Sequence, residues 1–307
     1  MVKLVATSVV RGSRQGESHG AVYIVDLEND HVYQPIDWTK PDIDWQGRGG
    51  DRGLRGIAIH EDRVFVVGSD ELYEYTPSFE LVATHRNLYL KHCHEICVHE
   101  HHLFITATAF DSILAFNLRT NVFDNAFMVK TDGRNLTMGQ YNPNSDAGPL
   151  PINKLHINNI FCEKGGMYVA GLRTKGLLLY NGERIGVSTT LPTGTHNARP
   201  FREGILFNDT ESNKLRYATR SRENDCAINV PLYANAELLN TEMDDARIAR
   251  QGFGRGLCAV SDTLIAAGSS PATVALYDLD KKKMDRAINF SKDIRNTIHT
   301  IAVWPFS

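Results

Sequence analysis

The stretch IHTIAVW, at Ile298–Trp304, decides the fold, because five similar stretches precede it in the chain. Each copy has a histidine or an arginine in second place, followed by the residues of a predicted inner strand. The other copies are LRGIAI at Leu54–Ile59, CHEICV at Cys93–Val98, LHINNI at Leu155–Ile160, THNARPF at Thr195–Phe201 and GRGLCAV at Gly254–Val260. A short pattern that recurs every 39 to 62 residues indicates a repeat architecture.

Further strands are predicted after each copy. The segment HLFITATAFDSILAFNL, at His102–Leu118, is an example. It contains a strand that ends in small residues, a polar loop, and a second strand rich in aromatic and β-branched residues. With the repeated stretch as its innermost strand, each repeat predicts one four-stranded blade of a β-propeller.

The two ends of the chain supply the last blade. Ile298–Trp304 is an inner strand with no strands after it, whereas KLVATSVVRGSRQGESHGAVYIVDL, at Lys3–Leu27, has the pattern of a blade without an inner strand. We therefore predict an all-β, six-bladed propeller, a single domain of residues 1–307. It is closed by pairing the C-terminal strand, about residues 298–304, with the N-terminal strands, about residues 3–34.

Composition excludes several classes of partner. The chain has 307 residues, of which 33 are Lys or Arg and 36 are Asp or Glu, and its net charge of −3 implies no general attraction to nucleic acid or anionic membranes. The N-terminal apolar stretch is too short for a signal peptide or a membrane span, so we expect a cytoplasmic protein. Five cysteines without paired spacing argue against a disulfide framework, and Cys97 and Cys258, at the same place in their repeats, are expected to be small core residues.

Two repeats are longer than the others by about 20 residues, which indicates inserted loops. The insertions are placed at about residues 132–154 and 221–252, where we expect them to cover the top face of the propeller. Ala236–Arg250 is predicted to form a short helix.

The second residue of each copy is the main functional clue, and we call these six the repeat residues: Arg55, His94, His156, His196, Arg255 and His299. In equivalent blades they would meet around one axis. Neutral imidazole binds Zn, Mn, Fe or Cu well, whereas Ca and Mg prefer oxygen ligands. We therefore predict one transition-metal ion held by the four histidines among them.

Two other interpretations of the histidines stay open. Each repeat histidine can serve the structure by hydrogen-bonding a loop between blades. The cluster His92, His94, His99, His101 and His102 is also dense enough for a local metal site, although the last three fall at the far end of the predicted inner strand.

The arginines suggest an anionic ligand. Arg55 and Arg255 flank His299 in blade order, so both guanidinium groups are predicted to bind one carboxylate, sulfate or phosphate. Three further residues are predicted to bind substrate from the same face, namely His19, Arg173 and Lys175. The alternative is that the repeat arginines pair with a neighbouring acid such as Asp51 or Glu95.

The ends of the blades, YEYT, LAFNL, LLLY, VALYDL and VYIVDL, lack a Trp-Asp dipeptide. In this they resemble the lactonase-like and NHL-like six-bladed propellers rather than WD40 repeats. The histidine centre resembles that of metal-dependent propeller lyases that act on uronates or on peptidyl hydroxyglycine. That resemblance implies a metal ion that polarises a carboxylate substrate, an arginine, Arg55 or Arg255, that holds the acid, and a basic group that removes a proton. Tyr141 and Tyr233 are candidates for that base or for lid contacts.

The leading hypothesis is a metal-dependent lyase or hydrolase that acts on a small anionic molecule or oligosaccharide at the channel mouth, with Arg55 and Arg255 in the catalytic centre. A non-catalytic propeller that binds or scaffolds a partner is the first alternative. A histidine-ligated iron or copper oxidoreductase is the second.

Overall fold

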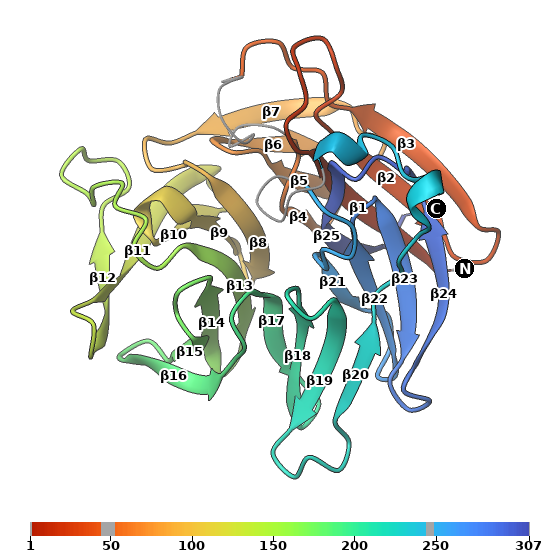
Figure 1. Cartoon of the computed structure of the whole chain (residues 1–307). Coiled ribbons are helices and arrows are strands. Elements are labelled where there is room, and N and C mark those ends of the chain that lie inside the picture. The colour runs from red at the N-terminus through yellow and green to blue at the C-terminus, as the bar shows by residue number, and fades with distance from the viewer. Residues whose placement is uncertain (1, 44–52, 244–248, 307) are drawn as a thin grey trace. The chain divides into compact units, whose positions relative to one another are not determined.

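The computed structural model describes residues 2–43, 53–243 and 249–306. Its strands form six antiparallel sheets, and every sheet has a simple up-and-down strand order. The fold is that of a six-bladed β-propeller, which confirms the predicted class (Figure 1). The chain forms two compact units, Met1–Ile57 with Pro200–Ser307 (unit 1) and Ala58–Arg199 (unit 2).

Unit 2 contains three sheets, whose strands are given in spatial order. The first is β4 (Ile57–His60), β5 (Arg63–Val67), β6 (Glu71–Tyr75) and β7 (Leu81–Arg86), with Ile57 itself in unit 1. The second is β8 (Cys93–His99), β9 (His102–Ala107), β10 (Ser112–Asn117), β11 (Val122–Thr131) and β12 (Leu136–Tyr141). The third is β13 (Ile157–Glu163), β14 (Gly166–Gly171), β15 (Gly176–Tyr180) and β16 (Ile185–Thr190). A 3₁₀ turn, η1 (Thr108–Phe110), joins β9 to β10.

Unit 1 contains the remaining sheets. One is β25 (Asn296–Trp304), β1 (Lys3–Val10), β2 (Gly20–Asp26) and β3 (His31–Asp37). Another is β21 (Leu257–Ala259), β22 (Leu264–Ser269), β23 (Thr273–Asp278) and β24 (Lys283–Asn289). The last is β17 (Thr195–Phe201), β18 (Gly204–Asp209), β19 (Lys214–Thr219) and β20 (Cys226–Asn229), and the chain passes from unit 2 into unit 1 within β17.

The predicted closure of the last blade is confirmed. β25 lies antiparallel to β1, with Lys3 opposite Trp304 and Val10 opposite Asn296 (Figure 1). The apolar side chains of this sheet pack with those of β21–β24 in one core, which includes Leu4, Val274 and Ile298. Burial of that apolar surface stabilises the pairing of strands that are almost the whole sequence apart.

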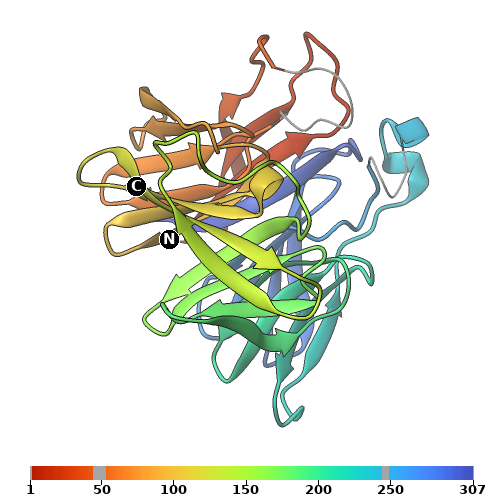
Figure 2. The ribbon, with the colours of Figure 1, turned by 90° about the vertical axis from the view of Figure 1, so that its left-hand side faces the viewer.

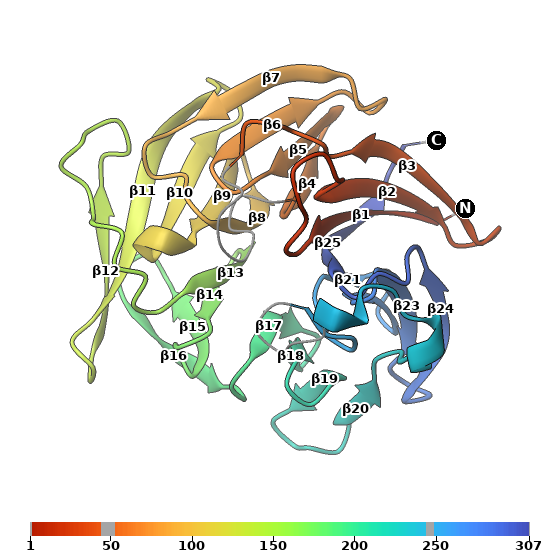
Figure 3. The same cartoon turned by 45° about the horizontal axis from the view of Figure 1, so that its top comes forward.

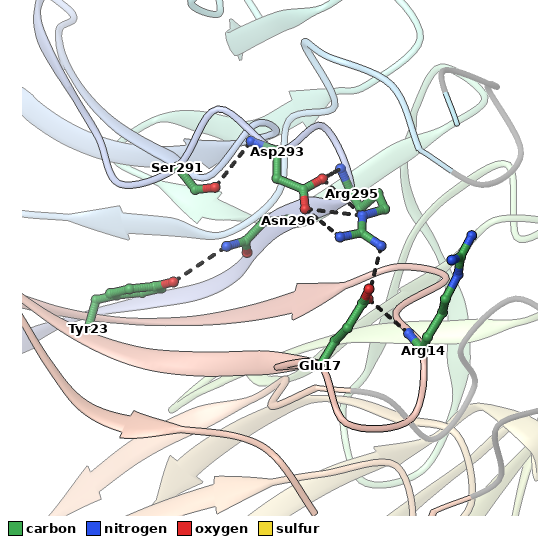
Figure 4. Close-up of polar contacts among 7 residues, drawn as sticks. All are labelled: Arg14, Glu17, Tyr23, Ser291, Asp293, Arg295 and Asn296. Atoms are coloured by element: carbon green, nitrogen blue, oxygen red, sulfur yellow. Dashed lines mark hydrogen bonds and ion pairs between the residues drawn. The ribbon is translucent and has the colours of Figure 1, made fainter. Parts of the chain in front are cut away.

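An ion-pair network also fastens this blade (Figure 4). Arg295, next to β25, binds Asp293 at 2.8 Å and Glu17, in the loop between β1 and β2, at 3.1 Å. Arg295 is largely buried, and its backbone carbonyl accepts a hydrogen bond from the Arg11 N–H. Side chain and backbone together therefore tie the end of the chain to its first loop.

The insertion predicted at residues 132–154 differs from a simple loop. Its first part forms β12, which pairs with β11 and is the outermost strand of a five-stranded sheet (Figures 2 and 3). Leu136 and Met138 face the core while Thr137 is exposed, which is the alternation of a half-buried strand. The second part packs against Tyr89, whose hydroxyl donates to the Ser145 carbonyl at 2.7 Å.

The second insertion, residues 221–252, lies partly outside the described residues. Its described part contains β20 and two 3₁₀ turns, η2 (Asn235–Glu237) and η3 (Thr241–Met243). Over residues 236–243 and 249–250 the predicted helix is therefore replaced by 3₁₀ turns and irregular chain. Within the described ranges, no helix has the length and apolar character needed to cross a bilayer.

Candidate functional site

Five of the six repeat residues lie near the start of an inner strand or just before it, and His299 is the fourth residue of the inner strand β25. Unit 2 contains His94, His156 and His196, and unit 1 contains Arg55, Arg255 and His299. Five of the six are buried, and His156 is partly buried.

The imidazole of His94 is held through its Nδ1 atom. Nδ1 lies 2.7 Å from the carbonyl oxygen of His92 and 2.9 Å from the hydroxyl oxygen of Thr108. A carbonyl oxygen can only accept, and the Thr108 hydroxyl already donates to the Ile157 carbonyl. Nδ1 must therefore carry the hydrogen, which leaves Nε2 as the acceptor nitrogen of the neutral ring.

The other two histidines of unit 2 share this tautomer. The His196 Nδ1 lies 3.1 Å from the Gly194 carbonyl oxygen, and the His156 Nδ1 lies 3.0 Å from Oδ1 of Asn153. Arg173, which can only donate, also contacts that Oδ1, so the atom is an acceptor. In all three rings an oxygen acceptor fixes Nδ1–H, so Nε2 has the lone pair that a metal ion or a proton donor requires.

Two of these rings lie close together. The ring centres of His94 and His156 are 5.6 Å apart and their planes are inclined by 70°. Two imidazoles that bind one tetrahedral ion through bonds of about 2.0–2.1 Å have ring centres about 5 Å apart, and a T-shaped ring pair also has a separation of about 5 Å. Within the described residues no three His, Cys, Asp or Glu side chains form a group that could hold a metal ion, so four-histidine coordination remains a prediction.

β-Bulges distort the inner strands at the repeat residues. The register of β8 against β9 shifts between Cys93 and Ile96, a gap that contains His94 and Glu95. The register of β13 shifts between Ile157 and Asn159. A bulge turns side chains away from strict alternation and is common beside binding sites, so these shifts explain how adjacent polar residues are buried together.

Three polar side chains beside the histidines were not predicted as site residues. The Asn197 amide donates a hydrogen bond to Oε1 of Glu95, and both side chains are buried. Asn158 is only 3% exposed, and neither its amide nitrogen nor its amide oxygen has a hydrogen-bond partner among the described residues. The sequence signal was clearest for Asn158, which occupies an inner-strand position that is apolar in the five other repeats.

The repeat residues of unit 1 are also fixed by the backbone. The Thr7 hydroxyl donates to the carbonyl of Arg55, and the backbone N–H of Arg255 donates to the Gly268 carbonyl at 2.8 Å. The register of β25 against β1 shifts beside His299, which is 2% exposed. Burial of two guanidinium groups requires anionic or hydrogen-bonding partners. Of the acids considered for that role, Asp51 lies outside the described residues, and Glu95 is the acceptor of Asn197.

His19, which was predicted to bind substrate, forms hydrogen bonds to two loops. His19 is completely buried, its Nδ1 accepts from the Gly53 N–H at 3.2 Å, and its Nε2 lies 3.1 Å from the Lys40 carbonyl oxygen. Both ring nitrogens are therefore used to hold loops, and the tautomer is opposite to that of the unit 2 histidines. His19 has the structural role that the alternative interpretation gave to the repeat histidines.

Arg173 does not extend toward a ligand either. Its Nε donates to the Lys154 carbonyl at 2.6 Å, and its Nη2 donates to both oxygens of Asn153. It therefore supports the residue that holds His156. Lys175 is exposed, and its ammonium group has no ion pair within the described part of the chain.

The two tyrosines proposed as bases lie elsewhere. Tyr141 is on β12, four strands outward from β8 in the sheet, where burial raises its pKa to about 12. Its ring packs against Tyr89 with centres 5.0 Å apart. The Tyr233 hydroxyl is hydrogen-bonded to Thr273 at 3.0 Å, and the Lys292 ammonium group lies 3.2 Å from the centre of its ring. Both tyrosines therefore have packing or hydrogen-bonding roles, and the catalytic role proposed for them stays a prediction.

The local histidine cluster is divided between the two ends of β8. His94 lies at the start of β8, whereas His99 pairs with His102 across the turn at its other end. His102 binds Asp124 at 3.1 Å. These histidines therefore belong to a surface turn rather than to one metal site with His94.

No protein-family model matches this chain, and no curated protein sequence matches it. Among solved structures, it is similar to a nidogen/laminin complex structure with a TM-score of 0.59 and 10% identity, over 99% of this chain and 98% of that one. It is also similar to a protein of unknown function from Bacteroides caccae, with a TM-score of 0.55 and 11% identity over 98% of both chains. A streptogramin B lyase structure matches with a TM-score of 0.44 and 12% identity, over 73% of this chain and 68% of that one. At these identities the first two likenesses show the propeller fold alone.

Proposed function

We propose that the histidines of unit 2 bind a transition-metal ion and that the protein is a metal-dependent lyase or hydrolase acting on a small, carboxylate-bearing molecule. The observation that carries this proposal is the shared tautomer of His94, His156 and His196, each with Nδ1–H bound to an oxygen. Metal-binding histidines are typically oriented in this way by the hydrogen bond of their other nitrogen.

Two further observations support the proposal of a metal ion in unit 2. The ring centres of His94 and His156, 5.6 Å apart, are close to the separation of about 5 Å for two imidazoles that bind one ion. Asn158 lies on β13, two residues after His156, and its amide oxygen, which has no hydrogen-bond partner among the described residues, is a second potential ligand. When bound, a metal ion of this kind would act as a Lewis acid on an oxygen atom of the substrate.

Glu95 is our candidate for moving the proton. It directly follows His94, is buried, and is held by the amide of Asn197. A fixed carboxylate in a buried polar environment is suited to general acid or base work. Within unit 1, Arg55 and Arg255 are proposed separately as anion-binding groups, and replacement of either by Lys should weaken carboxylate binding because the ammonium group cannot form a bidentate pair.

The test is the metal content of protein purified without a polyhistidine tag, measured by mass spectrometry of the elements Zn, Mn, Fe and Cu. We expect about one ion per chain in the wild type, and at least a tenfold loss in His94→Asn and His156→Asn. His99→Asn, at the other end of β8, is the matched control and should retain the metal. The absence of any bound metal after purification and after incubation with each of the four ions would overturn the proposal.

Activity is tested separately, by following loss of a panel of small carboxylates, uronates and carboxylate esters by nuclear magnetic resonance. We expect turnover that requires the metal and falls at least a hundredfold in Glu95→Gln. A protein that binds its metal but turns over none of these compounds would contradict the enzymatic part of the proposal.

A further inference from the structure

Two thiols of unit 2 meet between neighbouring inner strands. Cys97 is on β8 and Cys162 is on β13, 65 positions later. The backbone N–H of Cys162 donates to the Cys97 sulfur at 3.3 Å, and the Cys97 thiol donates to the Val98 carbonyl at 3.7 Å. Cys97 was expected to be a small core residue, so its contact with Cys162 is not evident from the sequence.

The surroundings make the two sulfurs unequal. The hydrogen bond from the Cys162 thiol lowers the pKa of Cys97, the Cys162 N–H and the Arg199 guanidinium act in the same direction, and burial opposes them. The hydrogen bond with Cys97, together with burial, raises the pKa of Cys162. Cys97 therefore has more thiolate character, and a thiolate is the form that reacts with peroxides.

Both thiols are partly exposed, whereas the three other cysteines are buried. Arg199, the third member of this group, lies on β17 with its guanidinium 5.8 Å from the centre of the Phe161 ring. The pair thus combines access, a nearby positive charge and a second sulfur in contact, which are the usual features of a redox-reactive cysteine with a resolving partner.

We propose that Cys97 and Cys162 form a reversible disulfide when the protein meets a hydroperoxide. The Cys97 thiolate attacks one peroxide oxygen, the O–O bond breaks, and a sulfenic acid and one molecule of water or alcohol are formed. The Cys162 sulfur then attacks the sulfenic sulfur, the S–S bond forms, and the S–O bond breaks with release of water. The peroxide gains two electrons, and each thiol loses one electron and one proton.

The bond would join β8 to β13 directly. His94 lies three residues before Cys97 on β8, and His156 immediately precedes β13, so the oxidised pair would restrain the two segments that place the rings of His94 and His156 5.6 Å apart. The chemistry itself does not depend on the proposed metal, and each can be tested without the other.

The experiment treats the full-length protein with hydrogen peroxide, counts thiols in denaturant, and maps disulfides by mass spectrometry of a non-reduced tryptic digest. We expect two of the five thiols to be lost and a crosslink between the peptides 92–119 and 155–164. Dithiothreitol should restore all five thiols. Retention of five thiols, or oxidation of Cys97 to sulfinic acid without a crosslink, would overturn the proposal.

Single cysteine variants test which two residues form the disulfide bond. Cys97→Ser and Cys162→Ser should each abolish the crosslink, and a crosslink that persists in either one would contradict the pairing. Cys258→Ser changes the cysteine at the equivalent place of another repeat and should leave the crosslink unchanged. Because peptide 92–119 also contains Cys93, Cys93→Ala should retain the crosslink, and its loss there would contradict the assignment to Cys97.

Discussion

His156 and Asn153 are joined by a hydrogen bond of 3.0 Å between the imidazole Nδ1 and the amide Oδ1, and both residues have a positive φ. The left-handed conformation is one that Asn adopts more readily than most residues. Arg173 holds Asn153 from the other side through its backbone and side-chain oxygens. The orientation of His156 therefore depends on a short chain of three residues.

Removal of the Asn153 side chain should weaken metal binding. Asn153→Gly keeps the left-handed backbone but removes the acceptor of the His156 Nδ1–H, and we expect the affinity to fall about 10- to 100-fold. Competition with a chromophoric chelator measures the affinity. Asn153→Asp retains an acceptor and should bind at least as well as the wild type, and equal affinities in all three proteins would show that this hydrogen bond has no role.

Gly171 is expected to tolerate no side chain, because a Cβ atom there would lie 2.5 Å from the His156 carbonyl oxygen and 2.7 Å from that of Leu155. We predict that Gly171→Ala lowers the free energy of unfolding by about 1–3 kcal/mol and also weakens metal binding. Gly186→Ala, in β16 of the same sheet, is the control, since its Cβ atom meets nothing within 4 Å. Urea unfolding that gives equal midpoints for the two variants would contradict the predicted clash.

Arg295→Ala should loosen the blade that contains both ends of the chain. Loss of the Asp293 and Glu17 contacts is expected to cost about 1–3 kcal/mol in the free energy of unfolding, measured with urea. Arg286→Ala removes a more exposed pair with Asp30 and should cost less than about 1 kcal/mol. A larger loss in the control than in Arg295→Ala would contradict the assigned role.

The loss of stability in Arg295→Ala should depend on pH, because one partner of Arg295 is the titratable residue Glu17. The N–H of Arg14 and, secondly, the Arg295 side chain lower the pKa of Glu17 below 4.5. The stabilisation is therefore present above pH 4.5 and is lost as the pH falls through the lowered pKa of the folded state. The difference between wild type and Arg295→Ala should shrink in acid, although only slightly, because Glu17 is 42% exposed and solvent screens it.

Tyr141 gives a prediction at alkaline pH. Burial raises its pKa to about 12, so the unfolded chain releases the phenol proton at a lower pH than the folded protein. Stability should therefore fall as the pH rises from about 10 to 12, and Tyr141→Phe should reduce that fall by about 1–2 kcal/mol. Chemical unfolding at pH 9, 10 and 11 measures the effect, and the exposed residue Tyr33, changed to Phe, is the control. Unchanged metal content at neutral pH would agree with the position of Tyr141 away from His94.

The fold could be predicted because each repeat contains its own strand pattern. The local sequence of the copies at Cys93–Val98 and Ile298–Trp304 was enough to predict inner strands. Because the N-terminal blade lacks an inner strand in its own sequence, the C-terminal copy was predicted to pair with it. The 62-residue interval between His94 and His156 revealed an insertion but not its structure. The alternation in LTMGQY, at Leu136–Tyr141, was the signal for a fifth strand.

The site could be predicted only in part, because its details depend on contacts between strands. Repeat alignment placed His94 and His156 at the start of their inner strands. It could not show that Asn153 orients one of them or that a bulge buries Glu95, since these depend on turn geometry and strand register. His19 shows the opposite case, in which a histidine with suitable sequence surroundings proved to hold two loops.

The pairing of β25 with β1 also affects how the protein is made. During synthesis the sheet that contains β1, β2 and β3 cannot gain its innermost strand until β25 has left the ribosome. Until then the inner edge of β1 has unpaired backbone N–H and C=O groups on the nascent chain. A premature stop codon before β25 would therefore leave this sheet incomplete, and such a product should be a preferred target for chaperones and proteases.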